Sequence, residues 1–360
     1  VWPLSQASFN NYLYSKYVTD ANLNAVRYYK TNEVKDSLGR VVVPADLEVP
    51  SNYSVTFYDS GTGRSVTRAS VTEVTNYDYE VELDDAKRKR IVLVAEQGVG
   101  DHLHTLGLLR PFIAKTKSEI ILCVEPRLKS LLQRSFPKVK VVTDFDLADP
   151  SIDYWMPYGD LGFLLDFNPK VSAICKPYIK RDPKLKLDWM DNLPKDRLNV
   201  GFSWRSGLVN PRRLNSYTLL SDWTDIISKK NVNAICLQYE DISEDIKELP
   251  ATIAKNLLVP DFDLKDDFES LALLIDKCDI VFGPFTAPSI QAAAQGTETI
   301  IFNLKSGDRW SFGNSLHYTE YKDEWYPNCH HFVFNQQTKG DLSNRIESLI
   351  DKTYEQKMKK

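Results

Sequence analysis

The chain has 360 residues, of which 42% are hydrophobic and 26% are charged, and its formal net charge at pH 7 is -4. This is the composition of an ordinary globular protein, and the length suits two domains with an additional module. The small negative charge gives no reason to expect nucleic acid or an anionic membrane surface as the main partner. The apolar runs are much shorter than the roughly 20 residues that span a bilayer, so no integral membrane segment is predicted.

The start of the chain and its thiols bear on where the protein acts. The start lacks an initiator Met and the basic and apolar regions of a signal peptide, which indicates a processed or trimmed chain. The five cysteines are widely spaced and have no CxxC spacing, so we expect reduced cytoplasmic thiols rather than disulfides or a zinc site. The cysteines are Cys123, Cys175, Cys236, Cys278 and Cys329.

Residues 1–87 differ from the rest in being rich in Tyr, Asn, Ser, Thr and Val. An amphipathic helix is predicted over 8–29. Residues 51–74 hold two alternating segments on either side of a DSGTGR turn, which is the signal of a β-hairpin. The charged residues 80–90 indicate an exposed connector. We therefore predict a small α+β accessory module over 1–87.

From residue 91 onward, short apolar strands alternate with helical segments, which predicts βαβ units and parallel sheets. We expect two Rossmann-like α/β domains, over 88–196 and 197–338, facing across a cleft, and a closing helix over 339–360. Ligands bind at the carboxyl ends of the strands in such folds. The predicted strands are 91–95, 119–125, 139–144, a late strand within 145–196, 198–204, 232–240, 279–284 and 297–304. The predicted helices are 102–115, 126–136, 216–230, 267–278 and 287–296.

The first candidate site is the sequence EQGVGDHLH, where a strand gives way to a helix. Gly98 and Gly100 let the backbone approach a ligand closely at a helix N-terminus. Asp101 is either the helix N-cap or a general base beside the cleft. Because His102 and His104 are two residues apart on a helix, only one of them is expected to face the cleft.

The second candidate is the loop after the strand 198–204. It carries Arg205, Arg212 and Arg213, followed by Asn215, Ser216 and Thr218 near a helix start. Guanidinium groups and hydroxyl or amide donors suit a diphosphate. The alternative is a solvated basic loop, and the position of this loop at the carboxyl end of a strand favours the phosphate interpretation.

Two further segments contain candidate residues. After Gly283-Pro284, Thr286 and Ser289 lie at the start of a helix rich in small residues, which indicates either an anion cradle or close packing of the helix on the sheet. The aromatic and charged residues of 306–332 line a pocket or, as the pattern favours, cover the edge of a core.

Four segments, in chain order, resemble counterparts in bacterial GT-B glycosyltransferases related to the ADP-heptose:lipopolysaccharide heptosyltransferases, a glycosyltransferase family 9-like group often fused behind tetratricopeptide repeats. The resemblance covers roughly residues 88–340 and leaves 1–87 outside. The segments are IVLVAEQGVGDHLHTLGLLRPF, VGFSWRSGLVNPRRLNSYTLL, DFESLALLIDKCDIVFGPFTAPSIQAAAQGTETIIF and DRWSFG…EWYPNCHHFVFNQ.

The resemblance implies a metal-independent, inverting transfer of a sugar from a nucleotide-sugar donor to a glycan, lipid-linked or protein hydroxyl, without a further cofactor. Asp101 falls on the family's proposed base and His104 on its histidine, so Asp101 and His104 are the expected catalytic residues, with His104 assisting the base at the cleft. His102 falls on a variable position. It also implies a cytoplasmic protein, or one peripheral to the inner membrane, with Gln238 near the donor base or ribose. The expected donor-binding residues are Gly98, Gly100, Trp204, Arg205, Arg212, Arg213, Gln238, Thr286, Ala287 and Ser289.

The chain departs from the family pattern at one place. Relatives often carry Asp-Thr-x-x-x-His where this chain has Phe285-Thr286 and then Ile290, so only Thr286 is retained. A catalytically weakened GT-B protein that binds a nucleotide sugar or glycan, or serves as a scaffold, is therefore the alternative. A nicotinamide-dependent oxidoreductase would require a third glycine after Gly98 and Gly100, which is missing.

Overall fold

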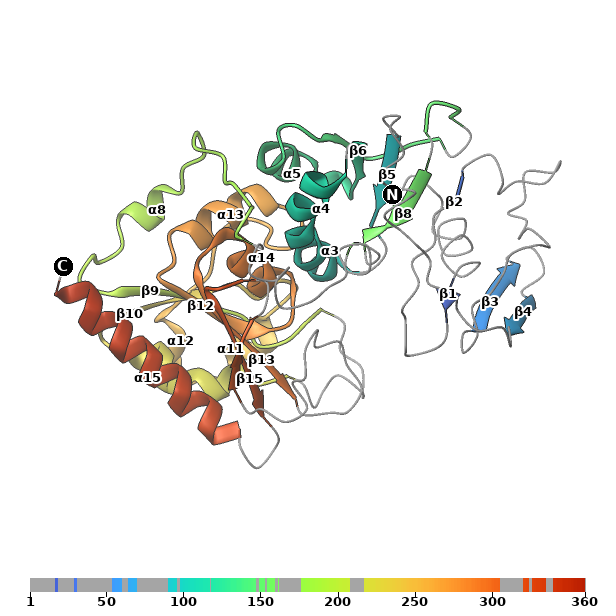
Figure 1. Ribbon diagram of the computed structural model, residues 1–360. Helices are drawn as coiled ribbons and strands as arrows, with labels where there is room; N and C mark the ends of the chain where they lie inside the picture. The colour runs from blue at the N-terminus through green and yellow to red at the C-terminus, as the bar shows by residue number, and fades with distance from the viewer. Residues whose placement is uncertain are drawn as a thin grey trace. The chain divides into compact units, whose positions relative to one another are not determined.

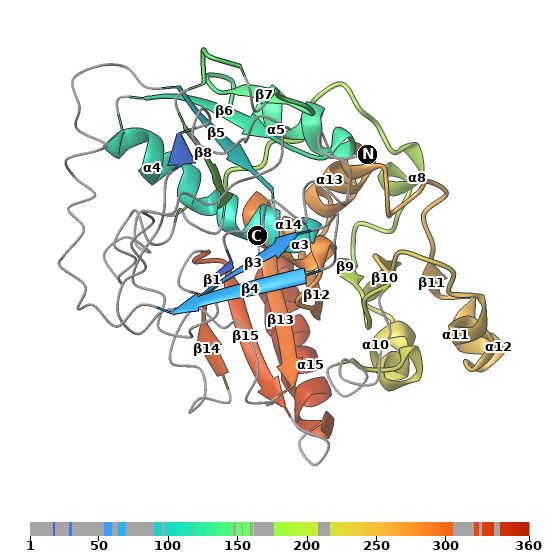
Figure 2. The same cartoon turned by 90° about the vertical axis from the view of Figure 1, so that its right-hand side faces the viewer.

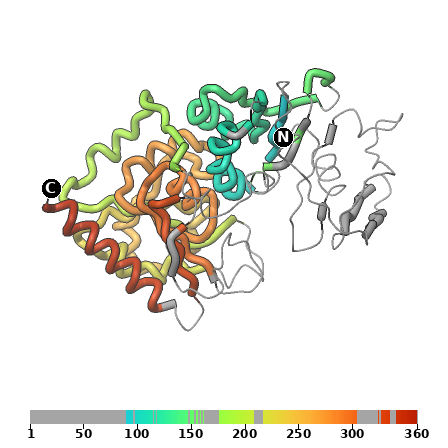
Figure 3. The backbone as a smooth tube through the Cα atoms, viewed as in Figure 1, coloured from blue at the N-terminus to red at the C-terminus, as the bar shows by residue number. Residues whose placement is uncertain are grey.

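The structure is a computed structural model, traced in Figure 3. It describes residues 90–95, 98–116, 118–146, 149–152, 154–158, 161, 176–207, 217–304, 320–323, 326–334 and 339–359, and the backbone of four strands nearer the N-terminus. Contacts divide the chain into two compact units, one of residues 1–98 and 108–171 and the other of residues 99–107 and 172–360. The domain boundaries predicted from the sequence stay predictions.

The first unit contains a five-stranded sheet in the order β2-β8-β5-β6-β7, in which only β2 runs antiparallel to its neighbour. Its core gathers apolar side chains of β5, β6 and β8, among them Val92, Ile121 and Trp155. The helices are α4 (Leu109–Lys115) and α5 (Lys129–Ser135). The strands are β2 (Tyr29–Lys30), β5 (Arg90–Val94), β6 (Glu119–Cys123), β7 (Lys140–Val142) and β8 (Tyr154–Pro157).

A second, three-stranded sheet of this unit contains the predicted hairpin. Strands β3 (Ser54–Asp59) and β4 (Arg64–Ala69) pair antiparallel, which confirms a hairpin around the DSGTGR turn. Strand β1 (Tyr17–Val18) pairs with β3. The helix predicted over 8–29 is therefore wrong at β1 and β2, where Tyr and Val favour extended pairing; its other residues lie outside the described part.

The second unit is built on a seven-stranded sheet in the order β11-β10-β9-β12-β13-β15-β14, whose strands are labelled in Figure 2. All neighbouring strands are parallel except β14 and β15. This confirms the predicted α/β class with parallel sheets, while the cleft between two domains stays a prediction. The strands are β9 (Leu198–Phe202), β10 (Val232–Cys236), β11 (Leu257–Leu258), β12 (Ile280–Pro284), β13 (Glu298–Leu304), β14 (Glu320–Lys322) and β15 (Cys329–Phe334).

Helices of the second unit cover this sheet. The long helix α15 (Lys339–Met358) buries Leu342, Ile346 and Ile350 against it, in agreement with the predicted closing helix. Helix α3 (Val99–Thr105) lies beside α14 (Ala287–Gln295), as Figures 1 and 2 both show. The other helices are α8 (Asp188–Asp191), α10 (Thr224–Ser228), α11 (Ser243–Lys247), α12 (Ala251–Ala254) and α13 (Phe268–Asp276).

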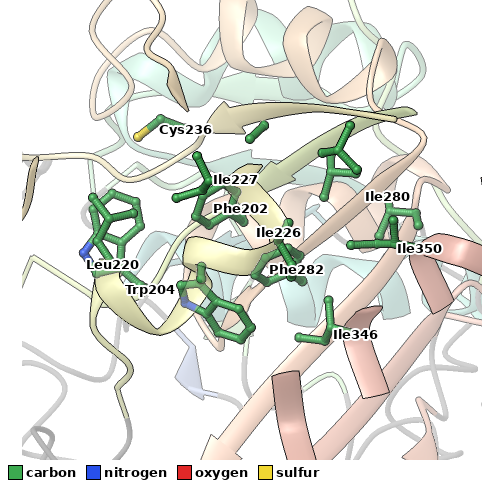
Figure 4. Close-up of a cluster of buried hydrophobic side chains, with 14 of the residues drawn as sticks. Phe202, Trp204, Leu220, Ile226, Ile227, Cys236, Ile280, Phe282, Ile346 and Ile350 are labelled. Carbon is green, nitrogen blue, oxygen red and sulfur yellow. The ribbon is translucent and has the colours of Figure 1, made fainter. Parts of the chain in front are cut away.

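An aromatic cluster forms the centre of the second unit's core (Figure 4). The rings of Phe202 on β9 and Phe282 on β12 stack with their centroids 5.0 Å apart, and Trp223 lies 4.7 Å from Phe282. Alternate residues of each strand point into this cluster because side chains alternate across a sheet. The cluster therefore fixes β9 against β12 just before both strands end.

Capping residues determine where the two helices beside the core begin and end. Asp267 accepts a hydrogen bond from the backbone N–H of Ser270 and so begins α13. Gly296, with φ of 94°, ends α14 in the left-handed conformation that glycine adopts readily. Among the described residues, no helix is long and apolar enough to cross a membrane.

Candidate functional site

The strand order of the second unit defines a switch point between β9 and β12. From β9 the chain continues to β10 and β11 on one side, whereas β12, β13 and β15 lie on the other side. In open α/β sheets, ligands bind outside the carboxyl ends of the strands at such a point. The residues that follow β9 and those at the end of β12 are therefore the first to consider as a site.

Gly283, the next-to-last residue of β12, lies between two serine hydroxyls. A Cβ atom added at Gly283 would lie 2.5 Å from Ser203 Oγ and 2.6 Å from Ser289 Oγ. Both serines are almost fully buried, with exposed fractions of 1% and 0%, and neither Oγ has a hydrogen-bond partner among the described residues. Buried hydroxyls are normally hydrogen-bonded, so each of these two calls for a polar partner such as a water molecule or a ligand group.

The start of α14 adds backbone donors beside these hydroxyls. Its N-cap residue, Thr286, is extended and makes no side-chain cap; its Oγ1 donates instead to the carbonyl of Pro284. The N–H groups of the first helical turn have no acceptor within the helix, and the helix dipole favours negative charge there. The arrangement of Gly283, Ser203, Ser289 and the start of α14 suits an anionic group such as a phosphate.

Helix α3 lies against this same turn of α14. A Cβ atom at Gly100 would lie 3.3 Å from the backbone N of Ala287 and 3.4 Å from the carbonyl carbon of Thr286. The absence of a side chain at Gly100 thus permits the close approach of two helices, and its predicted approach to a ligand stays a prediction. Asp101 is the next residue, and it is exposed.

The helix begins earlier than expected. It includes Val99, so Asp101 lies within its first turn and is not its N-cap. The interpretation of Asp101 as the N-cap is therefore wrong, because Val99 and Gly100, which precede it, are already helical. Gly98, which precedes the helix, is exposed. The predicted roles of Asp101 as base and of Gly98 as a donor contact stay predictions.

His104 is buried within the second unit and is surrounded by aromatic rings and a carboxylate. Its ring makes edge contacts with Phe285 and Tyr326, with centroids 5.3 Å and 5.8 Å away. Its Nε2 lies 3.9 Å from Oδ2 of Asp323. His102 is buried as well, so neither histidine of this helix is exposed.

Asp323 links His104 to His331. Its Oδ2 lies 2.6 Å from Nε2 of His331, and its Oδ1 accepts a hydrogen bond from the backbone N–H of Tyr326. Burial by itself would raise the pKa of Asp323, but hydrogen bonds and charge from His104 and His331 outweigh it and hold that pKa well below its usual value. Asp323 is thus an ionised group in a nearly dry environment.

Three other predicted residues hold loops together. Gln238 is buried, and its Oε1 accepts hydrogen bonds from the backbone N–H groups of Trp204 and Arg205. The Arg205 guanidinium donates to the carboxylate of Asp245 at 2.7 Å and to the carbonyl of Asp241. These bonds join the segments that follow β9 and β10, and a contact of these residues with a donor stays a prediction. Arg212 and Arg213 lie outside the described residues.

The segment after β10 is unusual in its backbone. Glu240 has φ of 71°, a left-handed conformation that is uncommon for a residue with a side chain. Its carboxylate forms an ion pair of 2.6 Å with Lys265, and the hydroxyl of the preceding Tyr239 accepts a hydrogen bond from the N–H of Gly207. Strained residues of this kind often occur at functional sites, and this one lies at the carboxyl edge of the sheet.

Several residues that the fold brings to this region carry no clear functional signal in the sequence. Gly283 was noted only as a strand breaker, and Ser203 carried no signal because an isolated serine after a strand is common. Asp323, Tyr326 and His331 lie in the segment 306–332, whose pattern favoured a cover for the core edge. The four described cysteines are buried and form no disulfide with one another, and the expectation of reduced thiols stays a prediction.

No family model matches the chain. It is 29% identical over 273 residues to Protein FlbA of Caulobacter vibrioides. The matched residues make up 70% of this chain and 44% of FlbA, so the chain spans less than half of that relative. The similar solved structures include three that we describe. E. coli ADP-heptose lipopolysaccharide heptosyltransferase II has a TM-score of 0.48 and 11% identity, covering 75% of this chain and 99% of that one.

Two further similar structures are also glycosyltransferases. A glycosyltransferase family 9 protein of Veillonella parvula has a TM-score of 0.46 and 9% identity, covering 79% of this chain and 99% of that one. The iron-containing dodecameric glycosyltransferase TibC of enterotoxigenic E. coli has a TM-score of 0.46 and 10% identity, covering 76% of this chain and 77% of that one.

Proposed function

We propose that this chain is a glycosyltransferase that moves a sugar from a nucleotide-sugar donor to a hydroxyl of a glycan, lipid-linked or protein acceptor. The transfer inverts the configuration at the anomeric carbon of the sugar, and no metal ion takes part in the reaction. The observation that carries the proposal is the pair of unpartnered hydroxyls of Ser203 and Ser289 beside the uncapped start of α14. The four segments that resemble glycosyltransferase family 9 supply the reaction class.

The donor diphosphate binds at the switch point. Its oxygens accept hydrogen bonds from the hydroxyls of Ser203 and Ser289 and from the first-turn N–H groups of α14. These donors stabilise the negative charge that grows on the leaving nucleoside diphosphate as the bond to the sugar breaks. Arg212 and Arg213 are expected to add positive charge from the preceding loop.

Asp101 acts as the general base. Its exposed carboxylate takes the proton of the acceptor hydroxyl while that oxygen attacks the anomeric carbon from the face opposite the diphosphate. The new glycosidic bond forms as the bond to the diphosphate breaks, which inverts the configuration. Because His104 is buried against Phe285 and Tyr326, it acts by holding α3 in place.

The proposal is tested first by donor binding. A panel of nucleoside diphosphates and nucleotide sugars, including ADP-heptose, should contain at least one ligand that raises the melting temperature. Gly283→Ala should abolish that shift, because the new Cβ atom would occupy the space between the two serine hydroxyls. Gly340→Ala is the matched control, since a Cβ atom there meets nothing within 4 Å.

Catalysis is tested with Asp101→Asn. This variant should bind the same donor with unchanged affinity but should lose transfer and donor hydrolysis by about 100-fold or more, the usual contribution of a general base. Unchanged turnover would remove Asp101 from the reaction. If no member of the panel stabilises the wild-type chain, the donor site at the switch point is wrong.

A second candidate function is a binding or scaffold protein that retains the site but has lost turnover. Phe285 favours it, because the family that the sequence resembles often has aspartate there. This candidate predicts that a nucleotide sugar binds to the wild-type chain and that Gly283→Ala abolishes binding, while neither transfer nor donor hydrolysis is measurable with any acceptor.

A further inference from the structure

Three side chains with metal-binding atoms converge at the turn between β14 and β15, and a fourth approaches one of them from α3. Asp323, Cys329 and His331 each offer one ligand atom, and these atoms lie within 4.8 Å of one another. Nε2 of His331 lies 2.6 Å from Oδ2 of Asp323 and 3.9 Å from Sγ of Cys329. His104 approaches from α3, with its Nε2 3.9 Å from the same Oδ2. We name these four residues the Asp–Cys–His cluster.

The backbone holds the cluster in place without any metal. Cys329 and His331 are two residues apart on β15, so their side chains share one face of the strand. Asp323 directly follows β14, and its N–H donates to the carbonyl of Cys329. The hydroxyl of Tyr326, in the same turn, donates to the carbonyls of Leu103 and His104 and so fixes the fourth residue.

Burial makes the charge of the cluster important. The side chains of His104 and Asp323 are each 7% exposed, that of His331 is 6% exposed, and Cys329 is fully buried. A divalent cation would balance the charges of one thiolate and one carboxylate with both imidazoles neutral, which avoids an uncompensated buried charge. Hydrogen bonds to Asp323 account for the positions of His104 and His331, but they do not account for the thiol of Cys329 beside them.

We propose that the Asp–Cys–His cluster binds a zinc-class divalent cation, with Asp323, Cys329 and His331 as ligands and His104 completing a tetrahedron. Zn²⁺ takes one sulfur, imidazole nitrogens and a carboxylate oxygen in such sites. Bond lengths near 2.0–2.3 Å place ligand atoms about 3.3–3.6 Å apart in a tetrahedron. The separation of 2.6 Å between Asp323 and His331 is shorter than that range, and the separations of 3.9 Å are longer, so the side chains would rotate to bind the ion.

The role of this cation is structural. The four ligands come from α3, from the end of β14 and from β15, and all four are buried, as in closed zinc sites. The cation would tie the short helix α3 to the turn that carries Tyr326. It is not part of the proposed transfer reaction, so the two proposals fail independently.

The test uses the full chain, stripped with a chelator and titrated with Co²⁺. We expect about one Co²⁺ ion per chain, with a thiolate-to-cobalt absorption band and the visible bands of tetrahedral cobalt. Cys329→Ser should remove the thiolate band, and His104→Gln should change the visible bands while leaving the thiolate band. Cys278→Ser is the matched control, because the Cys278 thiol is also buried but donates only to the carbonyl of Leu274.

Thermal melting with Zn²⁺ is a second measurement, which keeps the test informative where a variant folds poorly. Zn²⁺ should raise the melting temperature of the stripped wild-type chain, and Asp323→Asn should lose this shift while still giving a cooperative transition. Absence of a thiolate band with Co²⁺, or a band of equal strength in Cys329→Ser, would overturn the proposal. An equal Zn²⁺ shift in the wild-type chain and in Asp323→Asn would also overturn it.

Discussion

Ser289 is a residue at which binding and stability should respond in opposite directions. Its buried hydroxyl has no partner among the described residues, so the folded state carries the cost of desolvating it. Ser289→Ala should therefore leave the free energy of unfolding of the ligand-free protein unchanged or raise it by up to about 1 kcal/mol. The same change should weaken nucleoside diphosphate binding about tenfold, because one hydrogen bond to the phosphate is lost.

The matched control is Ser135→Ala in the first unit. The hydroxyl of Ser135 is also buried, but it donates to the carbonyl of Leu131 at 2.7 Å. Ser135→Ala should lower the free energy of unfolding by about 1 kcal/mol and leave nucleotide binding unchanged. Urea denaturation and calorimetric titration measure both quantities. A loss of stability in Ser289→Ala equal to that in Ser135→Ala would mean that Ser289 is a satisfied structural hydroxyl.

At the scale of elements, α3 is held at its C-terminal end by two tyrosines. The hydroxyl of Tyr326 donates to the carbonyls of Leu103 and His104, and that of Tyr178 donates to the carbonyl of Leu103. These bonds tie the last residues of α3 to two side chains from distant parts of the chain. Tyr326→Phe should lower the free energy of unfolding by about 1 kcal/mol and increase hydrogen exchange in α3.

Because both tyrosines share the Leu103 carbonyl, Tyr178→Phe and Tyr326→Phe should not be additive. The free energy of unfolding lost in the double variant should differ from the sum of the two single losses by at least about 0.5 kcal/mol. Tyr354→Phe on α15 is the control, since the described residues provide no hydrogen-bond partner for its hydroxyl. Additive effects would indicate that the two hydroxyls do not act on one helix end.

The same elements show what the sequence can predict. Short apolar runs located β9, β10, β12 and β13 to within a few residues. A buried parallel strand is apolar along its whole length, as IVFGP in β12 is. Strand β15 was missed because its inward positions include Cys329 and His331, and alternation with polar side chains does not resemble a core strand.

The candidate site was only partly predictable for a similar physical reason. The start of α14 was found from Gly283-Pro284 and Thr286, which interrupt a regular pattern. The partners of Gly283 come from residue 203 and residue 289, and those of His104 come from residues 285, 323 and 326. Such contacts depend on strand order, which hydrophobic periodicity does not determine.

At the scale of the whole molecule, buried thiols in both units make stability sensitive to alkaline pH. Burial, and to a smaller extent the charge of Asp144, raises the pKa of Cys123 in the first unit from 9.0 to about 12. Burial likewise raises the pKa of Cys236 in the second unit from 9.0 to about 12. Below pH 9 each thiol is protonated in both the folded and the unfolded chain, so the buried neutral thiol makes its full contribution to the free energy of unfolding.

Between pH 9 and about 12 only the unfolded chain releases these protons, so the free energy of unfolding should fall with rising pH by about 1.4 kcal/mol per pH unit for each thiol. Urea midpoints between pH 8 and 10, which precede most lysine titration, measure this slope. Cys236→Ala should remove one thiol's share from the second unit, and Cys123→Ala should do so for the first. If each variant keeps the wild-type slope, the thiols are not the groups that the fold holds protonated.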